Sequence, residues 1–240
     1  MIENIPWDSQ HFNLNVGTYN VPTQNQNFDL ETLLEEAKVC HYDVVYVRSN
    51  SPIIELENRQ MFKDERVVYS KDSTIRFTPP PIWPQEQKQN CISIRSCKNK
   101  EITNELIQLA LASGEYSRYK LDERFSEECF VKLYKDWIVN SIDKDFATDV
   151  LVASVNNHDV GLLTYKVIGE VSTIGILAVA TSHRGLHIGK QLMQCYRESL
   201  PPEVTTLKVV TQGVNQIARK YYESCGYSIE DISYTYHLWI

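Results

Sequence analysis

The order of apolar and polar residues predicts a series of helices and strands through the second part of the chain. Three short runs rich in Val, Leu and Ile have the length and composition of buried strands. Two segments before these runs and two after them carry apolar residues at helical spacing. The predicted elements are strand 91–96, helices 102–116 and 126–142, strands 149–156, 160–168 and 172–180, helix 187–200, strand 205–211, helix 215–225, and a closing pair of strands, 227–232 and 234–240.

The first part of the chain predicts fewer elements: a strand, a helix over 29–40, a strand from Asp43, a short helix and a hairpin. The hairpin covers 66–77, with its turn at 71–73. The order of elements in 43–77 repeats that in 205–239: strand, loop with Asn, helix, and a strand pair that ends in an aromatic residue. This repetition indicates that the first part is a half-domain that resembles the end of the second part.

A proline-rich segment separates the two parts. Residues 78–90 contain four prolines and a run of polar side chains. Proline lacks a backbone donor and has a fixed φ, so this segment cannot continue a helix or a central strand. We therefore predict a half-domain at 1–77, a linker at 78–90 and a larger domain at 91–240, and expect the chemistry mainly in the larger domain.

Composition narrows the class of partner. The chain of 240 residues has 31 Asp and Glu against 24 Lys and Arg, a net charge of −7. Nucleic acid favours basic surfaces, so it is not expected as the main partner, whereas a local basic patch could still bind a small phosphorylated ligand. No apolar stretch has the length of a membrane span, and residues 1–12 lack the features of a signal peptide. A cytoplasmic protein without membrane insertion is expected, with its six cysteines reduced.

The candidate chemistry follows the strand at 172–180. Arg184, Gly185 and Gly189 lie where the helix at 187–200 begins. The N-terminus of a helix has unpaired N–H groups and a partial positive charge, and both favour phosphate. Arg184 can add a charge-assisted hydrogen bond. A pyrophosphate site is one interpretation, and a glycine-assisted turn without a ligand is the alternative that spacing alone leaves open.

This stretch resembles the fingerprint of the GCN5-related N-acetyltransferase (GNAT) superfamily, (Arg/Gln)-x-x-Gly-x-(Gly/Ala) after an apolar strand. Here the stretch 184–189 reads "RGLHIG" and follows "ILAV" at 176–179. Asn215, Ala218, Tyr222 and the pair at 226–227 are similar to the family's last helix. The resemblance covers about residues 91–240. It implies an α/β (α+β) GNAT fold, with a mixed central sheet flanked by helices and a degenerate GNAT-like N-terminal half-domain.

The same resemblance implies acyl-CoA as co-substrate and no metal. The strand backbone would align the pantetheine arm, and the backbone amides of the turn would hold the pyrophosphate. The residues expected to bind acyl-CoA are Leu177, Ala178, Val179, Arg184, Gly185, Leu186, His187, Ile188, Gly189 and Asn215.

His187 departs from the fingerprint, which has Gly at this position. The pyrophosphate site uses backbone N–H groups, and His supplies one as well as Gly does. If His187 has helical φ and ψ, its side chain has no steric cost there unless it points at the ligand.

Segments across the whole chain are similar to the dTDP-fucosamine N-acetyltransferases: "IPWDSQHFNLNVG", "YSRYKLDERF" and "YYESCGYSIEDISYTYHLW". Those enzymes acylate an amino-dideoxyhexose carried on a nucleotide. The resemblance implies transfer of an acetyl group, or a longer group such as 3-hydroxybutanoyl, to a dTDP-linked amino sugar. The product would serve surface glycans such as the O-antigen of lipopolysaccharide, and a homodimer is compatible with this reading.

In this chemistry a neutral amine attacks the thioester directly, and a phenol can protonate the departing thiolate. The resemblance gives that role of general acid to Tyr222, for which a packed core aromatic is the alternative. Arg118, Asp122 and Arg124 are candidates to bind the diphosphate of the acceptor, with solvated surface charge as the alternative. Trp7 is predicted to pack against the first strand, and acceptor binding is its alternative.

Two other functions remain open. The first is acetylation of another small amine or of a protein N-terminus, which the acidic balance of the chain would suit. The second is a catalytically silent CoA-binding module.

Overall fold

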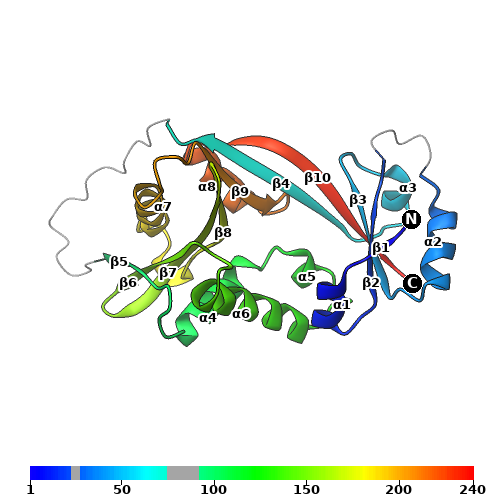
Figure 1. The fold of residues 1–240 in the computed structure, drawn as a ribbon, viewed down its shortest axis with the longest axis horizontal. Helices are drawn as coiled ribbons and strands as arrows, with labels where there is room; N and C mark the ends of the chain where they lie inside the picture. Colours follow the sequence, from blue (N-terminus) through cyan, green and yellow to red (C-terminus); the bar gives the residue numbers. More distant parts are fainter. Residues whose placement is uncertain (23–27, 75–91) are drawn as a thin grey trace.

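The computed structural model describes residues 1–22, 28–74 and 92–240 (Figure 1). The predicted linker, Cys91 and most of the second strand of the predicted hairpin lie outside these ranges. The helices and strands in chain order are β1 Glu3–Asn4, α1 Pro6–Phe12, β2 Val16–Asn20, α2 Leu30–Val39, β3 Val44–Ser49, α3 Ile54–Asn58, β4 Lys63–Asp72, β5 Ile92–Ser96, α4 Asn104–Ser113, α5 Arg118–Leu121, α6 Glu127–Asp143, β6 Asp149–Val155, β7 His158–Ile168, β8 Val171–Val179, η2 Thr181–His183, α7 Ile188–Glu198, β9 Thr206–Gln212, α8 Gln216–Ser224 and β10 Ser228–Trp239.

The strands in the described ranges form one ten-stranded sheet, in the order β1-β2-β3-β10-β4-β9-β8-β7-β6-β5. The pairs β2/β3 and β8/β9 are parallel, whereas the other neighbours are antiparallel. Helices flank this mixed sheet (Figure 1). The fold class predicted from the sequence is therefore confirmed.

The two long strands β4 and β10 join the two ends of the molecule (Figure 1). β4 comes from the first part of the chain but lies between β9 and β10. β10 is the last strand of the chain. It pairs with β4 from Ser228 to Tyr236 and with β3 from Tyr234 to Trp239. Each part of the chain thus contributes a strand that pairs with strands of the other part.

The predicted pair of closing strands is wrong. β10 is one strand from Ser228 to Trp239, with an irregularity between Ile229 and Asp231. A ladder partner accompanies it along its whole length, so no turn is needed at the polar position Ser233. The predicted hairpin turn is also wrong at Lys71 and Asp72, because both residues pair with β9 inside β4.

The core lies on both faces of the sheet. Ile188, Leu192 and Tyr196 of α7 are buried in one cluster with Val67 and Tyr69 of β4. The opposite face of the strands β6, β7 and β8 is covered by α4 and α6, and α2 and α3 cover the end of the sheet that contains β3. The fully buried contacts of α7 hold its N-terminus beside the end of β8, where the site lies.

Two short helices were not predicted. α1 begins at Pro6, which suits the first turn of a helix because its missing donor would be unpaired there. α5 covers four residues between the predicted helices 102–116 and 126–142. Both helices lie on the same side of the sheet as α6 and border the site described below (Figure 1).

Candidate active site

The sheet opens between its two parallel central strands. Pairing of β8 with β9 runs from Val171 and Thr206 to Ile174 and Val209, and stops there. β8 continues to Val179 beside β7 alone. The second half of β8 therefore presents one backbone edge to a cleft rather than to a neighbouring strand.

A bulge at Gly175 begins this separation. The β7/β8 register shifts between the pairs at Leu163 and Tyr165, and the Thr164 Oγ1 atom accepts a hydrogen bond from the Ile176 N–H at 2.9 Å. A Cβ on Gly175 would lie 2.9 Å from Thr164 Oγ1. Glycine is therefore needed at this bulge, and an isolated glycine inside a strand pattern is the sequence signal that could have predicted it.

The turn from β8 to α7 has two residues with left-handed backbone conformation. Gly185 has φ of 80° and no atom within 4 Å of where its Cβ would lie. His187 has φ of 58° and ψ of 13° and is the N-cap of α7. His187 therefore does not have helical φ and ψ, and its side chain has a steric cost. The glycine of the fingerprint at this position has a physical reason: the backbone needs a positive φ.

Gly189 has a different role from Gly185. It lies in the first turn of α7, and a Cβ there would lie 3.0 Å from the hydroxyl oxygen of Tyr221 on α8. The absent side chain lets α7 and α8 approach each other at the top of the cleft.

The N-terminus of α7 is open to a ligand. No side chain caps it, whereas Asp29, Thr103, Ser126 and Asn215 cap α2, α4, α6 and α8. Its first N–H groups therefore remain available to an anion.

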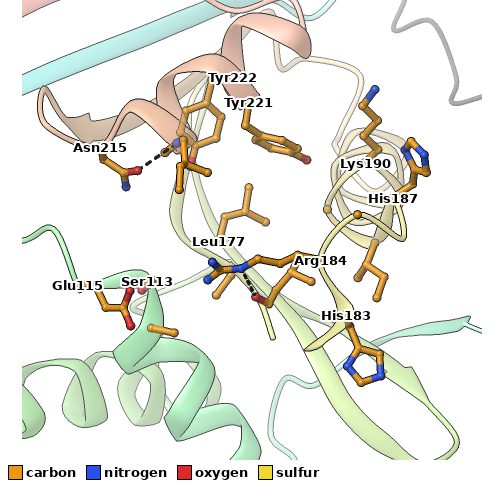
Figure 2. A pocket seen from close by; sticks show the side chains of 18 of the residues that line it. Ser113, Glu115, Leu177, His183, Arg184, His187, Lys190, Asn215, Tyr221 and Tyr222 are labelled. Atoms are coloured by element: carbon orange, nitrogen blue, oxygen red, sulfur yellow. Dashed lines mark hydrogen bonds between the residues drawn. The ribbon is translucent and has the colours of Figure 1, made fainter. Parts of the chain in front are cut away.

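A cavity of about 420 Å³ lies at this N-terminus. Figure 2 shows the side chain of Arg184 extended across it, with Lys190 and His187 on the α7 side. The Arg184 Nε atom donates to the Val179 carbonyl oxygen at 3.3 Å. Nine of the ten residues predicted to bind acyl-CoA line this cavity, and Leu186 packs against the core beside it.

A second, larger cavity of about 940 Å³ adjoins the first. It lies under α5 and α6, where Trp137 and Tyr134 form part of its wall. The two cavities share five lining residues: Ser113, Leu177, Asn215, Ala218 and Tyr222. A ligand in one cavity can therefore meet a ligand in the other at the end of β8.

Tyr222 stands at this junction. Its side chain points into the cleft from α8, beside Tyr221 (Figure 2), and only 6% of its surface is exposed. Burial raises the pKa of Tyr222 far above its usual value. The phenol is therefore protonated at neutral pH and can donate a proton.

Asn215 positions the helix that carries Tyr222. Its Oδ1 atom accepts a hydrogen bond from the Ala218 N–H at 3.1 Å and so caps α8. The cap fixes the start of α8 at the junction of the cavities. The predicted CoA-binding residue thus also has a structural role.

The three predicted acceptor-binding residues do not come together. Arg118 lines the second cavity, where its guanidinium carbon lies 4.0 Å from the ring centroid of Tyr46 and 4.6 Å from that of Tyr119. Asp122 and Arg124 line neither cavity.

Asp122 is engaged with the end of the chain instead. Its Oδ2 atom accepts hydrogen bonds from Trp239 Nε1 at 2.9 Å and from His237 Nδ1 at 2.7 Å. Burial alone would raise the pKa of Asp122, but these hydrogen bonds and that of the Arg124 N–H keep it below its usual value. This contact fastens the segment after α5 to β10.

The sequence reasoning missed two residues from the first part of the chain. Asp64 on β4 and Trp7 on α1 both line the second cavity. For Trp7 the sequence favours packing against the first strand and leaves acceptor binding as the alternative. The Trp7 ring is 55% exposed and stacks on His11 at 4.6 Å between ring centroids. No short motif marks either residue, since both reach the site only through the exchange of strands and the packing of α1.

The cysteines of the described ranges do not line either of the two cavities. Cys225 is buried, and burial raises its pKa, so the thiol is a poor nucleophile at neutral pH. The five cysteines within the described ranges are all free. In that part of the chain, no His, Cys, Asp and Glu side chains gather into a group that could hold a metal, and no helix is long and apolar enough to cross a membrane.

An opened parallel strand pair, a bulge and a glycine-containing turn into a helix are the arrangement that the resemblance to GNAT-type, acyl-CoA-dependent acyltransferases implies. Residues 147–229 match the family described as acetyltransferase (GNAT) domain. The resemblance to the GNAT superfamily seen in the sequence is thereby confirmed.

The fold is similar to those of two solved proteins. One is a conserved protein of unknown function from Staphylococcus epidermidis ATCC 12228, with TM-score 0.64, 12% identity, and coverage of 96% of this chain and 87% of that one. The other is a GCN5-related N-acetyltransferase from Sphaerobacter thermophilus, with TM-score 0.56, 13% identity, and coverage of 99% of this chain and 76% of that one. At these identities the likeness shows the fold alone.

A curated relative is the spore coat polysaccharide biosynthesis protein SpsD of Bacillus subtilis (strain 168). It is 27% identical over 140 residues, which are 57% of this chain and 47% of SpsD. The chain therefore spans about half the length of this relative.

Proposed function

We propose that this protein transfers an acyl group from acyl-CoA to the amino group of a dTDP-linked amino-dideoxyhexose in the cytoplasm. The acyl group is acetyl or a longer group such as 3-hydroxybutanoyl. The observation that carries the proposal is the junction of the two cavities at Leu177 and Tyr222. A donor in the smaller cavity and an acceptor in the larger one meet there.

The smaller cavity suits the donor. The pyrophosphate of acyl-CoA lies against the open N-terminus of α7, where backbone N–H groups and Arg184 supply donors and positive charge. The pantetheine arm runs along the free edge of β8 beyond Ile174. Lys190 and His187 add positive charge or hydrogen-bond donors near the phosphates (Figure 2).

The larger cavity suits a nucleotide-linked sugar. Its volume of about 940 Å³ lies at the upper end of the usual range for ligand sites. The Arg118 guanidinium provides a partner for a phosphate, and the exposed Trp7 ring provides a surface for a planar base. The printed name of SpsD concerns spore coat polysaccharide, and this supports an acceptor destined for a surface glycan.

The reaction needs two contributions from the chain. The acceptor amine attacks the thioester carbonyl, and a backbone N–H between Leu177 and Val179 stabilises the negative charge that develops on the oxygen. One such donor is worth about 3 kcal/mol. The Tyr222 hydroxyl then gives its proton to the departing thiolate.

A panel of acyl-CoAs crossed with dTDP-amino sugars, read by mass spectrometry, tests this function. We expect one acylated dTDP-amino sugar to form with free CoA in equal amount. Acylation of other small amines in the same panel, with none of the dTDP-amino sugars acylated, would overturn the assigned acceptor and leave the donor site in place.

A further inference from the structure

Asp64 is a carboxylate on the wall of the acceptor cavity. It lies in β4 opposite Thr235 of β10, two residues before Arg66, which pairs with Gln212 at the end of β9. Gln212, Thr211 and Asp64 line the same cavity. The position of β4 between β9 and β10 therefore brings an acidic side chain into a cavity that is otherwise lined by Trp7 and by residues after 112.

The Asp64 carboxyl has no hydrogen bond or ion pair with any residue of the described ranges. Other acids at this end of the molecule are engaged: Asp8 accepts a hydrogen bond from Tyr119 Oη at 3.3 Å, and Asp136 lies 3.8 Å from His11 Nδ1. A largely enclosed carboxylate without a partner is costly unless a ligand supplies one. A cationic group of the acceptor is the matching partner.

Burial and the neighbouring guanidinium groups shift the pKa of the Asp64 carboxyl in opposite directions, and the net result is a raised pKa. Burial raises the pKa of its carboxyl, and the nearby Arg118 and Arg66 guanidinium groups act against that rise, while Glu65 adds to it. These are the charged groups that act on Asp64 from its own strand and from α5. A carboxylate with a raised pKa holds a proton more firmly than an exposed one and is a better base near neutral pH.

We propose that Asp64 binds the ammonium group of the acceptor in the second cavity and takes one proton from it. This inference rests on the proposed function, in that it needs an amine acceptor in that cavity. The sugar –NH₃⁺ becomes –NH₂ as the Asp64 carboxylate becomes a carboxylic acid. The amine then forms the C–N bond, and the C–S bond breaks.

The remaining proton transfers balance. Tyr222 protonates the thiolate, and the second amine proton replaces the proton that Tyr222 gave. Asp64 releases its proton to water when the product leaves. The sum is one amide, one thiol and one proton for each ammonium group and thioester consumed.

Asp64→Asn tests the inference, with Glu65→Gln as the matched control. Glu65 is the next residue on β4 and lies 3.9 Å from Arg219, on the α8 side of the sheet. The quantity to measure is kcat/KM for the acceptor between pH 6 and pH 9, with whichever amine the panel shows to be acylated. CoA affinity and the melting temperature are measured on the same samples, and Asp64→Ser is a second variant in case Asn perturbs the fold.

We expect Asp64→Asn to lower kcat/KM by about 10²-fold at neutral pH, with CoA affinity unchanged. The loss shrinks as pH rises, because the free amine then becomes abundant in solution and needs no base. Glu65→Gln stays close to the parent. A loss that is the same at every pH, or activity of both Asp64 variants within a few-fold of the parent, would overturn the inference. Failure of every dTDP-amino sugar would overturn only the assigned acceptor, since Asp64 is tested on the amine that reacts.

Discussion

The Tyr221 hydroxyl oxygen lies 3.0 Å from the position that a Cβ on Gly189 would occupy. This contact explains the second glycine of the turn, which keeps α7 and α8 close at the donor cavity. Gly185, by contrast, is needed for its positive φ and leaves open space around it. The two glycines of the stretch 184–189 thus have different physical reasons.

Gly189→Val is expected to push Tyr221 away and to narrow the donor cavity. We expect CoA affinity to fall at least tenfold, which corresponds to about 1.4 kcal/mol, as measured by calorimetry on folded protein. Gly189→Ala combined with Tyr221→Phe is the matched rescue, because Phe lacks the hydroxyl that the new Cβ meets. Unchanged affinity in a folded Gly189→Val variant would contradict the assigned donor cavity.

His187→Gly tests the left-handed backbone at the start of α7. A non-glycine residue in this conformation costs about 1–2 kcal/mol. Glycine is therefore expected to increase the free energy of unfolding, and the gain is reduced by the stabilisation that is lost with the contacts of the imidazole. Urea unfolding measures this, and His187→Asn is the control, since Asn tolerates positive φ. We expect CoA affinity to change only a few-fold. A less stable glycine variant would contradict the strain at His187.

His237 predicts a loss of stability in acid. Burial lowers the pKa of His237 to about 4 from 6.5, despite the opposing hydrogen bond to Asp122. The unfolded chain therefore binds a proton that the folded chain rejects between these values, and stability falls as pH drops from about 6.5 to about 4. The upper bound of this loss is about 3 kcal/mol.

The measurement is the free energy of unfolding at several pH values for the parent and for His237→Gln. Gln does not titrate, so the variant is expected to lose less stability over the same window, although it is less stable at pH 7. Parallel curves for parent and variant would show that His237 does not titrate in this way.

Local pattern was enough to predict most elements of the larger part. The β-branched runs gave β6, β7 and β8 to within a few residues, and apolar spacing gave α4, α6, α7 and α8. Each of these elements is one continuous stretch of sequence that is either amphipathic or buried. The predicted donor residues follow from the same local stretch, because a turn and a helix N-terminus are contiguous features.

The acceptor side could not be predicted in this way. Asp64 and Trp7 reach the cavity through long-range strand pairing and helix packing, which no local pattern encodes. The sequence predicts two strands in place of β10 because local pattern does not show that β3 and β4 pair with it. The positive φ of His187 could not be predicted either, because it arises from the geometry of the turn and not from the residue itself.

The central claim is that acyl transfer takes place where the two cavities meet, with Tyr222 as the general acid. Tyr222→Phe keeps the ring and its burial while it removes the proton. Steady-state kinetics with acyl-CoA and the acylated amine acceptor, under conditions where chemistry limits the rate, measure its effect. We expect kcat to fall by about 10²- to 10⁴-fold with little change in KM for acyl-CoA. A Tyr222→Phe variant that keeps more than about half of the parental kcat would contradict the claim and leave Tyr222 as a packed core aromatic.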